Sequence, residues 1–164
     1  MVKKNFILYT RNFIFGSEDS LVSTVGLLAG IASAGVPRKE IIISGIVLIC
    51  VEAFSMSVGS FLSESETEES LSKNINNNSN SITASIIMLV SYIVCGLIPL
   101  SPYIFMDTKN AFWSSIVASM VFLFILGLIS AKILKIKVLK TTLKMTIMGG
   151  LAIGLGVVIG LIIK

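Results

Sequence analysis

Long apolar runs separated by short polar stretches form the main pattern of this chain. Five runs are long enough for a helix to cross a bilayer, which takes about 20 residues. We expect the membrane spans at residues 19–36, 41–62, 82–106, 111–131 and 145–163. A polar stretch at 63–81 separates the second span from the third. The pattern predicts an all-α protein, a single transmembrane domain over residues 1–164 with a short acidic segment at 63–81.

Residues 1–16 have a different pattern. Lys3, Lys4 and Arg11 alternate with bulky apolar residues, which predicts an amphipathic helix in the membrane interface rather than a cleaved signal peptide. Pro99 and Pro102 fall late in the third run, where we expect them to bend or end the helix.

The composition supports a multi-pass membrane protein, because 54% of the residues are hydrophobic and 13% are charged, against about 25% charged in soluble domains. The net charge of +4 then reflects basic loops beside membrane helices, not nucleic-acid binding. We expect the N-terminus in the cytoplasm and the C-terminus on the opposite side, because basic residues favour the cytoplasmic side. This orientation places nine of the 13 basic residues there: Lys3, Lys4, Arg11, Lys73, Lys132, Lys135, Lys137, Lys140 and Lys144. The chain has no histidine and no nucleophile–base, zinc or P-loop motif, so we expect neither an enzyme nor a cofactor.

Glu52 lies in the middle of the second apolar run. A charged residue at the bilayer centre costs about 2.5–3.5 kcal/mol on insertion scales and usually marks an ion or proton pathway. Helical spacing places it on one face with Ser55, Met56, Gly59 and Ser63. A carboxylate and a thioether on one face indicate a metal ligand set. The alternatives are a protonated carboxyl hydrogen-bonded between helices and, for Met56, simple packing.

Asp19 begins a similar stripe in the first span, with Ser23, Gly26, Gly30 and Ser33 on the same face. Asp19 and Glu52 lie at different depths on consecutive helices, which describes a route better than a closed cage. Asp19 also fits a helix N-cap, and that role does not exclude metal binding.

The acidic run after the second span allows two interpretations. If the helix continues beyond the membrane, Glu64 and Glu68 become neighbours one turn apart and form a carboxylate pair that collects divalent cations. Otherwise the run is a solvated loop.

Three glycine pairs have the spacing of close helix contacts, either within one chain or between subunits: Gly26 with Gly30, Gly150 with Gly154, and Gly156 with Gly160.

The first two spans resemble the vacuolar iron transporter family. GSEDSLVSTVGLLAG is similar to the family's Asp-x-Leu-Val opening, and EAFSMSVGSFLSE is similar to its Ser-Met signature. The resemblance covers about Arg11 to Glu69, with Ser20 and Ser60 as departures, and the family's cytoplasmic metal-binding domain shrinks here to Glu64–Ser81. It implies five spans, a homodimer, and exchange of cytoplasmic Fe²⁺ or Mn²⁺ for protons. Asp19 and Met56 match metal-path positions, and Glu52 is consistent with an acidic site.

We therefore expect a transporter that moves Fe²⁺ or Mn²⁺ out of the cytoplasm, with the metal as substrate and protons in exchange. Asp19 and Glu52 would bind the ion and take up protons, and Met56 would favour these metals over Mg²⁺ and Ca²⁺. Two alternatives stay open. One is a membrane-anchored binding or assembly subunit without transport, and the other is a proton-coupled carrier of another small cation.

Overall fold

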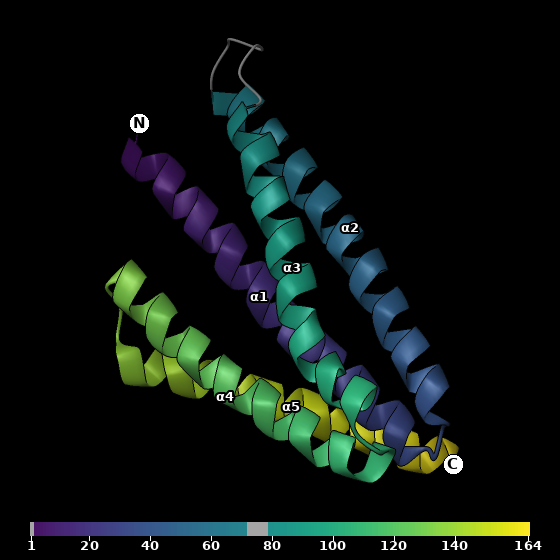
Figure 1. The fold of residues 1–164 in the computed structure, drawn as a ribbon. Helices are drawn as coiled ribbons and strands as arrows, with labels where there is room; N and C mark the ends of the chain where they lie inside the picture. The colour runs from purple at the N-terminus through teal and green to yellow at the C-terminus, as the bar shows by residue number, and fades with distance from the viewer. Residues whose placement is uncertain (1, 72–78) are drawn as a thin grey trace.

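The computed structural model describes residues 2–71 and 79–164. Its five helices are α1 (Val2–Ser33), α2 (Arg38–Leu71), α3 (Ser79–Phe105), α4 (Thr108–Leu134) and α5 (Val138–Ile163) (Figure 1). All five are long and apolar enough to cross a membrane, and the described residues contain no strand. The predicted all-α class and the five spans are confirmed.

The helices are longer than the apolar runs that predicted them. The segment expected as a separate interfacial helix is continuous with the first span in α1, and its place at the membrane interface stays a prediction. The second helix continues through the acidic run to Leu71, and α5 begins at Val138, so that Lys140 and Lys144 are helical rather than part of a loop. Helix ends follow local backbone capping, not the loss of apolar side chains.

Local caps, formed by the backbone or by a side chain, set three of these helix ends. Gly35 follows α1 with a φ of 82°, a left-handed conformation that glycine adopts without strain. The Asp107 side chain caps α4 by accepting a hydrogen bond from the Asn110 amide. This bond and a second one from the Asn110 side chain lower the pKa of Asp107. Lys135 ends α4 with a φ of 55°.

Both prolines of the third span lie inside α3, which continues to Phe105. Pro102 has no amide hydrogen to donate to the carbonyl of Ile98. The Ser101 hydroxyl donates to that carbonyl instead, at 2.9 Å. Ser115 of α4 donates to the Pro99 carbonyl at 2.7 Å. The Ser101 hydroxyl thus satisfies the carbonyl that Pro102 leaves without an amide donor, which is one way in which membrane helices accommodate proline.

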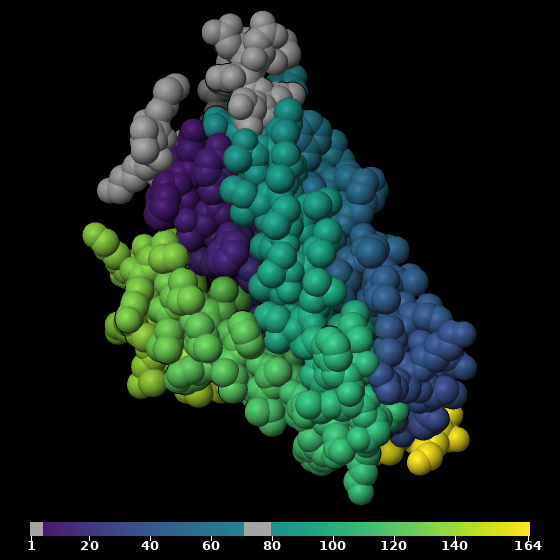
Figure 2. Space-filling model, viewed as in Figure 1, coloured from purple at the N-terminus to yellow at the C-terminus, as the bar shows by residue number. Residues whose placement is uncertain are grey.

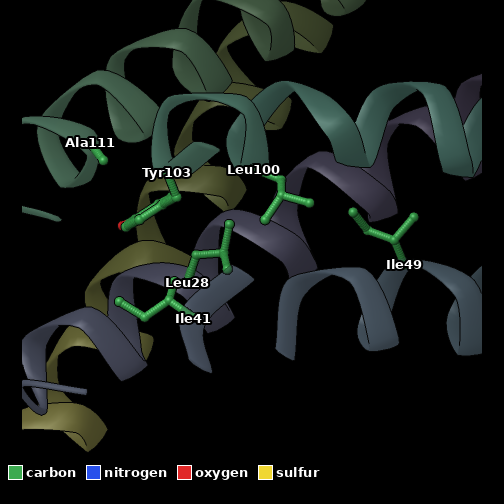
Figure 3. Packing of buried hydrophobic residues seen from close by; sticks show 6 residues of the cluster. All are labelled: Leu28, Ile41, Ile49, Leu100, Tyr103 and Ala111. Atoms are coloured by element: carbon green, nitrogen blue, oxygen red, sulfur yellow. The ribbon is translucent and has the colours of Figure 1, made fainter. Parts of the chain in front are cut away.

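Helix α1 is the centre of the fold and contacts each of the other four helices. In the space-filling view, α3 lies between α1 and α2 (Figure 2). Buried side chains from four helices fill one core, in which Leu28, Ile49 and Leu100 lie between α1, α2 and α3 (Figure 3). The position of α1 therefore depends on packing around its whole circumference.

Glycines bring α1 and α5 into close backbone contact. A Cβ atom at Gly156 or Gly160 would overlap the carbonyl of Gly26 or Gly30, respectively. These two predicted pairs thus form one contact within the chain. The remaining pair differs, because Gly154 is exposed and has nothing within 4 Å of an added Cβ.

Candidate metal pathway

The two carboxylates expected at membrane depth lie on neighbouring helices, Asp19 on α1 and Glu52 on α2. Both side chains are half-buried, and they are close enough for their charges to interact. Glu18, which precedes Asp19 in the chain, interacts electrostatically with Asp19 and also with Lys144 of α5. The fold therefore brings the two predicted carboxylates near each other, one on α1 and one on α2.

Tyr92 of α3 is a third member of this site that the sequence interpretation missed. Its side chain is fully buried, and its hydroxyl shares a 2.8 Å hydrogen bond with Ser23. The phenol lies within electrostatic range of both Asp19 and Glu52. Ser20 fixes the same residue by donating to its backbone carbonyl at 2.6 Å. A tyrosine in the middle of an apolar run was the available signal, since its buried hydroxyl requires a polar partner.

Met56 lies one turn after Glu52 and is half-buried like it. The rest of the predicted stripe, Ser55, Gly59 and Ser63, is exposed, and Gly59 has open space beside it. Among the residues that the structure describes, no group of three or more His, Cys, Asp or Glu side chains could hold a metal ion. Metal binding by Asp19, Glu52 and Met56 stays a prediction.

The acidic run forms the end of α2, which places Glu64 and Glu68 one turn apart, as the extended-helix interpretation required. Both are partly buried, whereas Glu66 and Glu69 are exposed. Glu64 forms an ion pair with Arg11 of α1, and Glu68 accepts a 2.9 Å hydrogen bond from the buried Ser81. Both carboxylates thus have protein partners, and their proposed role in collecting metal stays a prediction.

Further polar contacts join α1, α2 and α3 near the N-terminus of α1. The Ser60 hydroxyl donates to the Asn12 side chain at 2.6 Å, and Asn12 donates to the carbonyl of Leu8. Asn5 and Tyr9 of α1 both donate to Asn80 of α3. The N-terminal half of α1 is therefore held by polar bonds, which differ from the glycine contact that holds its second half.

Five apolar helices with carboxylates and a tyrosine hydroxyl within the spans are the features of a polytopic membrane transporter. The sequence model of the VIT family matches residues 10–85 and 66–161. The chain therefore belongs to the VIT family, the vacuolar iron transporter family, and the match extends through the helices that carry no recognisable motif. No curated protein matches the chain significantly.

Proposed function

We propose that the protein exports Fe²⁺ or Mn²⁺ from the cytoplasm in exchange for protons. The observation that carries this proposal is a pair of half-buried carboxylates on neighbouring membrane helices, Asp19 on α1 and Glu52 on α2, with the buried Tyr92 hydroxyl of α3 nearby. Two ionised carboxylates balance the charge of a divalent ion. When the ion leaves, each can take up a proton, so that neither remains charged in a medium of low dielectric constant. Exchange then follows from electroneutrality at the site.

Met56 supports a transition metal as the substrate. It lies one turn from Glu52. A thioether binds softer metal ions, whereas Mg²⁺ and Ca²⁺ prefer oxygen ligands. Tyr92 adds a hydroxyl within electrostatic range of Asp19 and Glu52, and a hydrogen bond to Ser23 holds it. This mixed set favours Fe²⁺ and Mn²⁺ while leaving the ion labile enough to move on.

We further propose a homodimer in which a second copy covers the exposed polar face of α2. A mid-membrane carboxylate beside lipid costs about 2.5–3.5 kcal/mol, so a half-buried Glu52 favours a protein neighbour. Gly59, with nothing within 4 Å of an added Cβ, leaves room for another helix. The second copy would then complete the route that one chain leaves open.

The proposed orientation places the N-terminus in the cytoplasm and the end of α5 on the opposite side. The lysines of the α4–α5 turn then lie in the cytoplasm with the end of α2, in agreement with the preference of basic residues for that side. Metal would enter near Glu64 and Glu68 and reach Asp19 and Glu52 within the membrane.

The test is Mn²⁺ flux into proteoliposomes that contain only this chain, with a fluorescent dye reporting the proton movement. Wild-type protein should move Mn²⁺ and protons in opposite directions, and Glu52→Gln should abolish both. Glu40→Gln is the matched control, because Glu40 is an exposed acid in the first turn of the same helix. Metal binding without flux would support the binding-subunit alternative, and proton-coupled flux of another small cation in place of Mn²⁺ would support the other-carrier alternative.

A further inference from the structure

Two side-chain contacts join α1 to α2 near the N-terminus of α1: the Arg11–Glu64 ion pair and the Asn12–Ser60 hydrogen bond. We call these four residues the polar seam. Helix α1 packs less extensively against α2 than against any other helix. These two bonds are thus a large part of what holds α1 and α2 together at this end.

The polar seam lies between the end of α2 and the membrane carboxylates. Arg11 precedes Asp19 by eight residues and Glu64 follows Glu52 by twelve, which correspond to about 12 and 18 Å of helix. Both helices that carry the carboxylates are therefore tied together on the same side of them. An ion that approaches between α1 and α2 from this side meets the polar seam first.

The two members of the ion pair differ in exposure. The Glu64 side chain is 12% exposed, whereas that of Arg11 is 65% exposed. A carboxylate so far buried needs a counter-cation, because an unpaired buried charge is strongly unfavourable. The guanidinium lies at the surface and can turn away into water. A cation that replaces it at Glu64 would therefore break the bond without leaving the carboxylate unpaired.

We propose that Arg11 is the gate residue of the metal route. Its guanidinium closes the polar seam by pairing with Glu64, and an arriving divalent metal ion displaces it and allows α1 and α2 to separate. Arg11 acts through Glu64 and not on the transported ion at the membrane carboxylates. This proposal rests on the proposed transport function.

The first test compares the apparent KM for Mn²⁺ among variants in proteoliposomes. Arg11→Gln should lower KM at least about fivefold, the lower range of coupling between linked sites. Arg11→Lys keeps a cation and should stay near wild type. Arg38→Gln is the matched control, since Arg38 bonds α2 to the carbonyls of Tyr103 and Ile104 on α3. If Arg11→Gln and Arg38→Gln reduce only the maximal flux and leave KM unchanged, Arg11 is structural and the gate is refuted.

The second test locks the polar seam with a disulfide in a Cys50→Ser, Cys95→Ser background. The Asn12 and Ser60 side chains are in hydrogen-bond contact, so Asn12→Cys with Ser60→Cys places two thiols close together. The oxidised protein should lose most of its flux, because α1 and α2 can no longer separate at the polar seam, and reductant should restore it. Full flux with the disulfide formed would overturn the gate.

The outcomes for the gate and for transport are distinguishable. Wild-type protein without Mn²⁺ flux, oxidised or reduced, refutes the proposed function and the gate with it. Wild-type flux that either Arg11→Gln or the disulfide fails to alter in the expected direction refutes the gate alone. If the double cysteine variant does not fold, the KM comparison of Arg11→Gln with Arg11→Lys and Arg38→Gln decides.

Discussion

Replacing Gly156 with Ala should weaken the packing of α5 on α1. The new Cβ atom would lie 2.9 Å from the carbonyl carbon of Gly26 and closer still to its oxygen. Ordinary contacts of this kind are about 3.5–4.0 Å. Backbone atoms cannot rotate away as a side chain can, so the two helices must move apart.

Two opposing effects set the magnitude. Ala favours a helix over Gly by about 0.8–1.0 kcal/mol, and overpacking costs about 1–3 kcal/mol. Gly154→Ala provides the first effect without the second, because nothing lies within 4 Å of its added Cβ. The helix preference therefore cancels when the two variants are compared. We expect Gly156→Ala to be less stable than Gly154→Ala by about 1–3 kcal/mol.

The measurement is equilibrium unfolding of both variants in mixed micelles, followed by circular dichroism and fluorescence with increasing denaturant. The midpoint for Gly156→Ala should fall below that for Gly154→Ala at an unchanged slope. Equal free energies of unfolding would refute the reasoning, because they would mean that α1 and α5 do not approach closely at these glycines.

Other substitutions test the site directly. Glu52→Gln keeps shape but loses titration, so the protein should fold normally and lose proton-coupled flux; normal flux would remove Glu52 from the mechanism. Met56→Leu should cost under about 1.5 kcal/mol of stability yet reduce discrimination against Mg²⁺ and Ca²⁺, and an unchanged competition profile would make Met56 a packing residue only. Neutralising the exposed pair Glu66 and Glu69 should raise the KM for Mn²⁺ at low salt, with little change in maximal flux, because exposed charges are screened over about 8–10 Å at higher salt; an effect that persists in high salt would contradict this. Asp107 has a lowered pKa in the folded protein, so its contribution to stability is present above its unfolded pKa and is lost as the pH falls through the folded one; Asp107→Asn should remove that part of the acid sensitivity in thermal unfolding.

Much of the fold was predictable because membrane helices are marked by single-sequence features. The apolar runs identified five spans, and the high cost of a mid-membrane acid drew attention to Glu52. Helix ends were less predictable, since they depend on caps such as Gly35 and Asp107. The α2 extension was predictable only as one of two alternatives, because polar residues occur in both exposed helices and loops.

The partners of the site residues were not predictable from the sequence. Helical periodicity gives the face on which a residue lies but not which helix that face meets. Tyr92 is adjacent to Ser23 only because α3 packs on α1. Arg11 belonged to an expected interfacial helix, and its pairing with Glu64 depends on the length of two continuous helices.

The glycine contact between α1 and α5 also has a consequence for biosynthesis. Gly26 and Gly156 are separated by 130 residues of sequence (156 − 26). Helix α1 enters the membrane early, yet the surface that receives its glycines is translated only after α2, α3 and α4. During that interval the nascent chain carries a central helix without the helix that contacts its glycines. A ribosome that stops before α5 would release a four-helix chain with that surface uncovered, which makes such a product a target for membrane quality control.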